Sequence, residues 1–185
     1  MLHAALPRGV RARRADALRD VSGRPAAAFL DRDGTINVKA PEGEYVERPA
    51  QLRLLDGAAA AVARLNAARI PVIVVTNQRG IALGRMTEED LAAVHARLDE
   101  LLAAEGAHVD AYYHCPHDKG VCDCRKPGTA MLEQAAREHG IDLARSVLVG
   151  DSASDVEAGR RVGARTVLLG RDAESLLAAV EALLA

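Results

Sequence analysis

Aromatic residues are scarce in this chain of 185 residues, which has no tryptophan, one phenylalanine and three tyrosines. So few flat side chains leave little surface on which nucleic-acid bases could stack. The charge is also unsuitable, because 24 basic and 26 acidic residues give a formal net charge of −2 and no excess of basic side chains for phosphate contacts. We therefore expect no nucleic-acid partner.

Long apolar runs are absent as well. Charged residues interrupt every alanine-rich segment before it reaches the roughly 20 residues that cross a bilayer. Residues 1–24 carry six arginines but lack the continuous apolar core and the small-residue cleavage site of a secretory signal. We expect no membrane partner, a cytoplasmic location and a basic, mobile N-terminal extension over residues 1–24, with contact to an acidic surface as its alternative role.

Cysteine is limited to three residues, which cannot all pair in disulfides. A chain of this length buries about 70% of the surface that its unfolded form exposes, so it needs neither disulfides nor a partner to form a core. Hydrophobic residues make up 49% of the chain and charged residues 27%, the balance of an ordinary globular protein. We expect a single domain over residues 25–185, and a monomer.

Short apolar runs alternate with helical patterns from Pro25 onward, which predicts βα units and a parallel sheet. The expected strands are Ala26–Leu30, Ile70–Val75, Val109–Tyr113, Val147–Val149 and Thr166–Leu169. The expected helices are Gly57–Ala68, Thr87–Glu105, Gly128–His139, Ser154–Val162 and Glu174–Leu184. Thr87 with Asp90 resembles a helix-opening capping arrangement. The predicted fold class is α/β, a Rossmann-like doubly wound parallel sheet.

Polar residues stand where three of these strands end. Asp31 follows the first strand, Thr76 the second and Asp151 the fourth. Because the carboxyl ends of parallel strands share one edge of a sheet, side chains from distant positions can meet there in one crevice. This convergence predicts an active site.

The acidic residues in these segments suit phosphate chemistry. Asp31 and Asp33 lie on one turn, where one carboxylate could attack while the other handles protons, and Gly34 lets backbone amides approach an anion. Asp151 and Asp155 add hard oxygen ligands of the kind that Mg²⁺ prefers. Since several clustered carboxylates repel one another strongly, the motif requires a divalent cation.

Groups that bind a phosphoryl oxygen are expected at the same edge. Thr76 and Asn77 bring a hydroxyl and an amide, while Arg125 and Lys126 bring fixed positive charge. Lys126 would act as a point charge on the transferring group. The planar fork of Arg125 suits bidentate contact with a second phosphate or a sugar hydroxyl.

All three cysteines fall within ten residues and stand beside a histidine. Cys115, His117, Cys122 and Cys124 offer three thiolates and one imidazole, the donor set of a closed, structural zinc site. The alternative is a mobile loop of reduced cysteines. His114 is a possible substitute ligand that we rank below His117, because it would end the preceding strand. Zinc at this position would hold the two basic residues after Cys124 in place.

Four motifs stand in a fixed order: Phe-Leu-Asp-Arg-Asp-Gly-Thr at 29–35, Val-Thr-Asn-Gln at 75–78, Cys-Arg-Lys-Pro at 124–127 and Gly-Asp-Ser-Ala-Ser-Asp at 150–155. Together they resemble the haloacid dehalogenase superfamily of phosphatases. Within it, the chain is similar to the compact branch without a separate cap domain, which contains heptose-bisphosphate phosphatases and histidinol-phosphatases. The resemblance covers about residues 26–169, and the Cys-Pro-His order of that branch supports His117 as the zinc ligand.

The resemblance implies specific roles. Asp31 is the expected nucleophile that forms an aspartyl-phosphate, and Asp33 is the expected acid and base for the leaving sugar oxygen and for water. Thr76 and Lys126 would grip the phosphoryl group. The implied magnesium ligands are Asp31, the backbone carbonyl of Asp33, Asp151 and the supporting Asp155.

The loop over residues 77–86 bears on the substrate. It reads Asn-Gln-Arg-Gly-Ile-Ala-Leu-Gly from Asn77, closer to the Asn-Gln-Ser-Gly-Ile-Ala-Arg-Gly of heptose-bisphosphate phosphatases than to the Asn-Gln-Asp-Gly-Leu-Gly-Thr of histidinol-phosphatases. Arg79 and Leu83 depart from the heptose pattern, and Arg79 or Arg85 could meet a second phosphate. The expected substrate contacts are Arg32, Lys39, Tyr45, Asn77, Gln78, Arg79 and Arg125.

The resemblance implies a magnesium-dependent phosphatase, and the loop over residues 77–86 favours removal of the 7-phosphate of D-glycero-D-manno-heptose 1,7-bisphosphate. Histidinol phosphate is the alternative substrate, favoured by the four residues that separate His117 from Cys122, a short zinc loop. A phospho-receiver domain is a rival of another class, but receivers place their acidic pair and their phospho-acceptor on different strands. A non-catalytic, zinc-stabilised binding module is the last rival, and no group that the chemistry needs is missing from this sequence.

Overall fold

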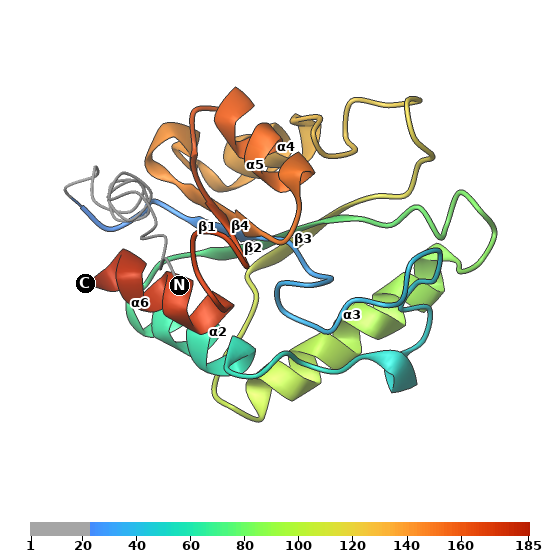
Figure 1. The fold of residues 1–185 in the computed structure, drawn as a ribbon, viewed down its shortest axis with the longest axis horizontal. Coiled ribbons are helices and arrows are strands. Elements are labelled where there is room, and N and C mark those ends of the chain that lie inside the picture. The colour runs from blue at the N-terminus through green and yellow to red at the C-terminus, as the bar shows by residue number, and fades with distance from the viewer. Residues whose placement is uncertain (1–22) are drawn as a thin grey trace, which may run out of the picture.

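A computed structural model of the protein describes residues 23–185, so the expected mobile extension at residues 1–24 lies outside the described residues except for its last two. Figure 1 shows a central sheet between two layers of helices. Its five strands are all parallel and run in the order β3-β2-β1-β4-β5. The strands are β1 (Ala28–Leu30), β2 (Val72–Asn77), β3 (Ala111–Cys115), β4 (Val147–Gly150) and β5 (Arg165–Leu168). The chain starts mid-sheet and builds first one side and then the other, which confirms the doubly wound α/β class.

The described helices begin and end within two residues of the predicted positions. They are α2 (Ala58–Ala67), α3 (Glu88–Ala103), α4 (Ala130–His139), α5 (Ala153–Arg161) and α6 (Leu176–Leu184), with 3-10 turns η1 (Pro49–Gln51) and η2 (Leu143–Arg145). The capping of α3 is confirmed: the Thr87 hydroxyl accepts a hydrogen bond from the Asp90 amide at 3.1 Å, and the Asp90 carboxylate accepts one from the Thr87 amide at 2.9 Å. Gly140 ends α4 with a φ of 64°, a conformation that glycine adopts without a steric penalty.

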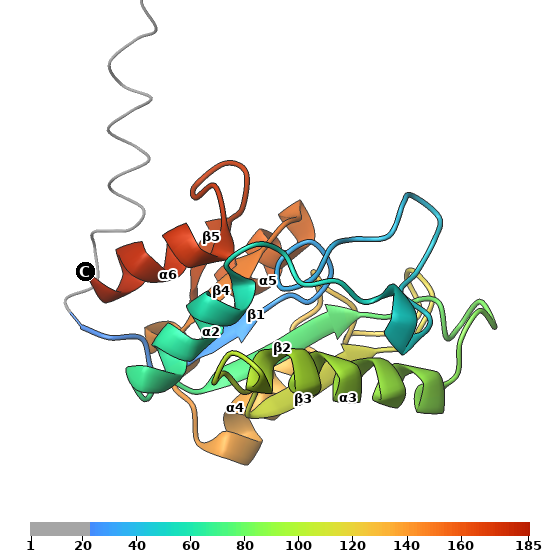
Figure 2. The ribbon, with the colours of Figure 1, turned by 90° about the horizontal axis from the view of Figure 1, so that it is seen from below.

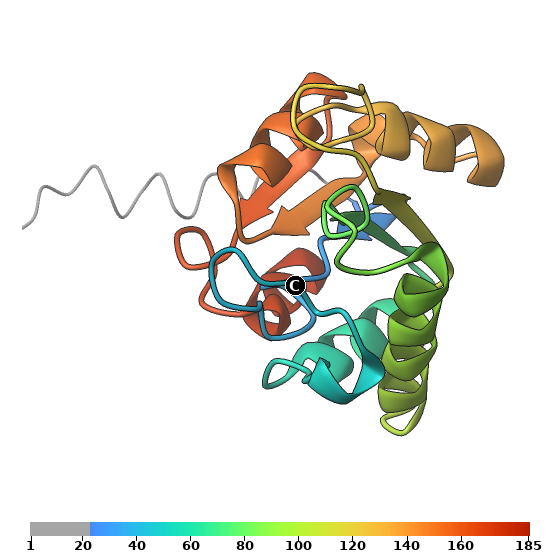
Figure 3. The ribbon, with the colours of Figure 1, turned by 90° about the vertical axis from the view of Figure 1, so that its right-hand side faces the viewer.

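Alternating side chains of the strands feed two separate cores. Leu30 and Val74 pack toward α2, α3 and α6 on one face of the sheet, whereas Phe29 and Val75 pack toward α4 and α5 on the other. The two further views show the same layering, with α2, α3 and α6 together in front of the sheet in Figure 2 and on the opposite side from α4 and α5 in Figure 3. Both faces being covered explains why the strands read as continuous apolar runs.

β2 and β3 each extend two residues further toward the site than predicted. β2 includes Thr76 and Asn77, because these residues pair in parallel register with His114 and Cys115 of β3. The expected strand end at Val75 is therefore too early, and polar side chains hid the continuation. As a result, Thr76 and Asn77 are fixed by sheet hydrogen bonds, and Cys115 is anchored at the end of a strand.

No second folded unit is inserted between β1 and α2. Residues 31–57 form a long loop that holds η1 and two isolated bridges, Asp33 with Asn37 and Asn37 with Leu54. The expected absence of a separate cap domain is thus confirmed over residues 23–185. Within the same residues, every helix is too short or too polar to cross a membrane.

Candidate active site

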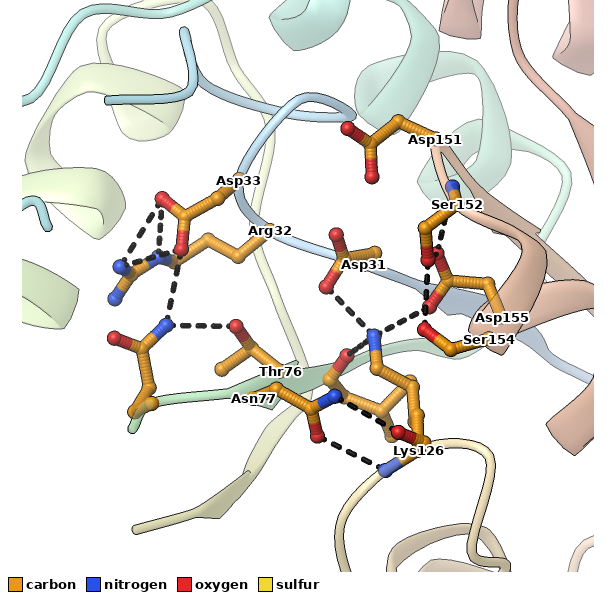
Figure 4. Close-up of polar contacts among 12 residues, drawn as sticks. Asp31, Arg32, Asp33, Thr76, Asn77, Lys126, Asp151, Ser152, Ser154 and Asp155 are labelled. Carbon is orange, nitrogen blue, oxygen red and sulfur yellow. Dashed lines mark hydrogen bonds and ion pairs between the residues drawn. The ribbon is translucent and has the colours of Figure 1, made fainter. Parts of the chain in front are cut away.

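Three carboxylates from two strand ends meet at the carboxyl edge of the sheet. Asp31 follows β1, Asp151 follows β4, and Asp155 lies in the first turn of α5. One oxygen from each lies within 4.8 Å of the other two, and Figure 4 shows Asp31 facing Asp151 and Asp155 across a small gap. We call Asp31, Asp151, Asp155 and the intervening Lys126 the acidic floor.

Glycine at two positions makes this close approach possible. A Cβ atom at Gly34 would collide with the carboxylate of Asp151, and one at Gly150 would collide with the carboxylate of Asp155. Gly34 also has a φ of 90°, which an L side chain rarely adopts. The acidic floor therefore depends on glycine in both motifs.

Lys126 supplies the positive charge that the floor itself contains. Its Nζ lies 2.7 Å from Oδ1 of Asp31 and 2.6 Å from Oδ1 of Asp155, and it donates a hydrogen bond to the Val75 carbonyl at 2.7 Å. Asn77 holds the backbone of Lys126 from both sides, accepting from its amide at 3.0 Å and donating to its carbonyl at 3.2 Å. The sequence motif at the end of β2 thus positions the lysine from another loop.

Burial and charge shift the pKa values of the floor in opposite directions. Burial raises the pKa of Asp31 to about 6, although the ammonium of Lys126 opposes the shift, and the nearby carboxylate of Asp155 adds to it. Burial alone would lower the pKa of Lys126, but Asp31 and Asp155 outweigh it and raise the pKa. The floor has more negative than positive charge and is suited to a further cation.

The donor set fits magnesium. Carboxylate oxygens are the hard ligands that Mg²⁺ prefers, and the three that lie close together would leave positions for water or a phosphate oxygen. An exposed cationic side chain already reaches the same group, since Nζ of Lys39 lies 2.7 Å from Oδ2 of Asp151. Asp155 is the most constrained of the three, because its second oxygen accepts hydrogen bonds from the amide and hydroxyl of Ser152.

Asp33 lies beside the floor with its carboxylate turned toward other partners. Arg32, Asn37 and Gln78 all donate hydrogen bonds to it. Burial alone would raise the pKa of Asp33. The charge of Arg32 and the hydrogen bonds from Asn37 and Gln78 together have a larger, opposite effect, so the net shift is downward. The two carboxylates of the motif therefore differ, one with a raised and one with a lowered pKa.

An open cavity of about 490 Å³ lies over the floor. Five of the expected substrate contacts line it: Lys39, Tyr45, Asn77, Arg79 and Arg125. Arg32 and Gln78 were expected there too, but the structure places both elsewhere: neither lines the cavity, and they are 0% and 1% exposed. Both face inward and hold Asp33, so contact with substrate through these two side chains does not fit the geometry.

The rim of the cavity carries basic side chains on loops. Nε of Arg79 donates a hydrogen bond to Oδ1 of Asp118 at 2.6 Å. This contact anchors Arg79 to the segment over residues 115–124 that contains all three cysteines, which we call the cysteine loop. Arg125 lines the cavity and has a buried Nη1 without a hydrogen-bond partner among residues 23–185. Arg85, the alternative to Arg79, pairs with Glu47 at 3.0 Å and is not part of the lining.

Sequence reasoning missed several polar lining residues, among them Lys119, Ser152 and Ser154. Lys119 belongs to the rim and lies in the cysteine loop. The sequence shows its charge but does not show that its side chain lines the cavity. Ser152 and Ser154 belong to the motif around Asp151, and their hydroxyls lie 2.8 Å apart. Their place in that motif was the available signal.

The cysteine cluster brings four possible metal ligands together, Cys115, His117, Cys122 and Cys124. Sγ of Cys124 lies 3.1 Å from Sγ of Cys115 and 3.2 Å from Sγ of Cys122, and Nδ1 of His117 lies 3.2 Å from Sγ of Cys124. Ligands of a tetrahedral zinc ion are about 3.6–3.8 Å apart for the usual bond lengths. Burial and the neighbouring sulfur atoms raise the pKa of Cys124. The donor set therefore fits zinc, whose charge would offset the crowding of the sulfur atoms, which lie closer together than the ligands of a bound zinc ion.

His114 lies outside this cluster. It belongs to β3, and its Nε2 pairs with the carboxylate of Glu88 at the start of α3 at 2.7 Å. The grouping of possible metal ligands in the described chain includes His117 and not His114. The geometry thus agrees with the ranking of the two histidines.

Known proteins resemble this chain in sequence and in fold. The model of the HAD-hydrolase-like family matches residues 123–181. Over 148 residues the chain is 41% identical to the D-glycero-beta-D-manno-heptose-1,7-bisphosphate 7-phosphatase of Rhodopseudomonas palustris, which covers 76% of this chain and 81% of the relative. The enzyme of the same description from Pseudomonas aeruginosa is 43% identical over 143 residues, with coverages of 76% and 79%.

A solved structure of a heptose bisphosphate phosphatase is also similar to this chain. The fold is similar to the crystal structure of D,D-heptose 1,7-bisphosphate phosphatase from B. bronchiseptica complexed with magnesium and phosphate, with a TM-score of 0.78. The match covers 85% of this chain and 98% of that one, at 33% sequence identity.

Proposed function

Because the chain belongs to the haloacid dehalogenase-like hydrolases and, within them, to the family of the heptose-bisphosphate phosphatases, we propose that it removes the 7-phosphate of D-glycero-D-manno-heptose 1,7-bisphosphate. It is an enzyme, a phosphoric monoester hydrolase. The observation that carries the proposal is one cavity with an acidic floor and a rim that carries the basic side chains of Lys39, Arg79, Lys119 and Arg125 beside Glu42 and Glu44.

In the first step, a carboxylate oxygen of Asp31 attacks phosphorus while the bond from phosphorus to the sugar oxygen breaks. Asp33 gives the leaving oxygen a proton, which avoids release of an alkoxide. Magnesium held by Asp31, Asp151 and the Asp33 carbonyl, with Asp155 in support, would supply positive charge that offsets the repulsion between carboxylate and phosphate. The product of this step is a phosphoryl group on Asp31 and a free sugar hydroxyl.

In the second step, water attacks the phosphorylated Asp31 and releases phosphate. Asp33, now a carboxylate, accepts a proton from that water, so the enzyme returns to its starting state. Thr76, Asn77 and Lys126 are placed to hold the phosphoryl oxygens, because all three line the cavity next to Asp31.

Zinc held by Cys115, His117, Cys122 and Cys124 would be structural. The site uses four protein ligands, which leaves no position for substrate or reacting water. Cys124 directly precedes the two basic residues that enter the cavity. A fixed loop keeps their positive groups aimed at phosphate without taking part in the chemistry.

The rim supports a substrate with a second phosphate. Arg79, Lys119 and Arg125 bring three positive groups to the loop side of the cavity. They would attract a bisphosphate and repel the ammonium group of histidinol phosphate. The relatives from R. palustris and P. aeruginosa are named for the β anomer, and we expect the same preference here.

Phosphate release from the purified protein tests the proposal. Both anomers of the heptose bisphosphate and histidinol phosphate are compared at matched concentrations, with magnesium and with a chelator. We expect magnesium-dependent release with the β anomer as the best substrate. Preference for histidinol phosphate would show that the short cysteine loop, not the loop at residues 77–86, reports the substrate.

A further inference from the structure

Arg32 is a charged residue with 0% exposure that lies, in the sequence, between the two aspartates of the motif. Its guanidinium grips Asp33, with Nη2 at 2.9 Å from Oδ2 and 3.1 Å from Oδ1, and Nε at 3.4 Å from Oδ1. Figure 4 shows the fork facing the Asp33 carboxylate, on the side away from Asp31. Nothing in the proposed two-step reaction uses this buried charge.

The contact determines how the Asp33 carboxylate is oriented. Asn37 donates to Oδ1 at 2.9 Å and Gln78 donates to Oδ2 at 3.0 Å, so both oxygens have donors besides the guanidinium. Arg32 is the one donor among these that touches both oxygens. A planar fork fixes the plane of a carboxylate, which a single hydrogen bond does not.

The surroundings leave Arg32 with little else to bind. Its Nη1 is buried without a hydrogen-bond partner among residues 23–185. The nearby His95 of α3 stacks on Tyr112 of β3 at 4.3 Å between ring centroids, and burial together with the charge of Arg32 keeps its imidazole neutral. Because the neighbouring rings carry no opposite charge, Asp33 is the group that balances Arg32.

We propose that Arg32 is a positioning residue that orients Asp33 for proton transfer to the leaving sugar oxygen. The inference rests on the proposed function. As the bond between Asp31 and phosphorus forms, the bond from phosphorus to the sugar oxygen breaks, and its electron pair takes the proton of Asp33. Asp33 is left as a carboxylate that Arg32 holds until water returns a proton.

The chemistry of the leaving group separates this role from a structural one. An alkoxide is a poor leaving group and needs its proton during bond cleavage, whereas p-nitrophenolate leaves readily without one. A misaligned Asp33 should therefore slow phosphoryl transfer from the alkyl ester more than transfer from the aryl ester, whereas the later hydrolysis of phosphorylated Asp31 is common to both esters. A distorted fold would slow both.

The experiment measures kcat and KM of the full chain with magnesium, for the heptose bisphosphate and for p-nitrophenyl phosphate. Arg32→Lys keeps the charge and removes the fork, and Arg32→Met removes both. We expect Arg32→Lys to lower kcat/KM, which reports phosphoryl transfer to Asp31, about tenfold or more for the sugar ester and less than about threefold for the aryl ester. Arg64→Met, which removes an exposed arginine of α2 paired with Glu181, is the matched control and should change neither ester.

Equal losses on the two esters in Arg32→Lys, or no loss on either, would overturn the inference. Because Arg32→Lys retains the buried charge, it decides the question even where Arg32→Met does not fold. Thermal unfolding of each variant confirms that the folded protein is compared. A wild-type protein that releases no phosphate from either ester would overturn the proposed function itself, and the inference with it.

Discussion

The floor and the rim of the cavity are built in different ways. The floor side chains stand at strand ends or are clamped to them, and Asp31, Lys126 and Asp155 are 8%, 4% and 1% exposed. The rim comes from three loops that follow β1, β2 and β3, and its side chains contact solvent. Arg79 of the rim is anchored through Asp118, whose side chain is 44% exposed.

This difference predicts which residues determine the rate of catalysis and which determine substrate affinity and preference. Buried opposite charges interact strongly, and removal of one partner leaves the other without compensation. Exposed ion pairs are screened by water and contribute little on their own. Changes in the floor should therefore abolish turnover, while changes in the rim should shift affinity and substrate preference.

The largest expected effect comes from the floor. Asp31→Asn keeps the size of the side chain and removes the attacking oxygen, so kcat should fall at least about 1,000-fold. The asparagine can still accept the hydrogen bond from Lys126, which should leave the fold and the zinc content unchanged. Steady-state phosphate release measures the effect, with Asp56→Asn, an exposed carboxylate outside the cavity over the floor, as the control.

The next largest effect is expected in the cysteine loop, which leads directly into Arg125 of the rim and Lys126 of the floor. Cys122→Ser should lose zinc, lower the melting temperature by roughly 5–10 °C and reduce kcat/KM about tenfold, because the loop positions Lys126 and Arg125. Metal analysis and thermal unfolding measure the first two changes. His114→Gln, next to the loop but paired with Glu88, should retain zinc; equal zinc content in Cys122→Ser and the wild-type protein would refute the structural zinc site.

A smaller effect is expected at the rim. Arg79→Ser should raise KM for the bisphosphate about tenfold with little change in kcat, the loss of one charged hydrogen bond to the second phosphate. Arg85→Ser should leave KM unchanged, since Arg85 lies outside the cavity lining. A large fall in kcat for Arg79→Ser would contradict the division between floor and rim.

The smallest effect concerns the layer behind the floor. Burial and the charge of Arg32 lower the pKa of His95 to about 3 from its usual 6.5. A folded-state pKa below the unfolded value gives stability above pH 6.5 that is lost as the pH falls, about 2 kcal/mol by pH 5. His95→Phe keeps a ring against Tyr112 and cannot titrate. From pH 7 to pH 5, the unfolding free energy of the wild type should fall by that amount relative to the variant. An unchanged difference between the two proteins would argue against a neutral histidine at this position.

The floor could be anticipated from the sequence because one topological rule governs it. Residues that follow parallel strands meet at one edge, so Asp31, Thr76 and Asp151 were placed together before their contacts were known. The fold class and the family also followed from the order of the motifs. The end of β2 was missed because strand pairing with β3 outweighed the polar character of Thr76 and Asn77.

The rim and the inner partners could not be predicted in the same way. Arg32 was predicted to contact the substrate, but the turn after β1 directs its side chain inward, where it is buried and holds Asp33. The pairing of Arg79 with Asp118 depends on how two loops approach each other, which no local pattern encodes.

The most direct test of the account is to look for the phosphoryl group on the floor. Rapid-quench mass spectrometry during turnover of the heptose bisphosphate with magnesium would follow the peptide that spans Asp31. We predict a transient phosphoryl group on Asp31 that forms and decays at rates compatible with kcat. Turnover at the full rate with no phosphorylated Asp31 at any time point would contradict the assignment of this carboxylate as the nucleophile.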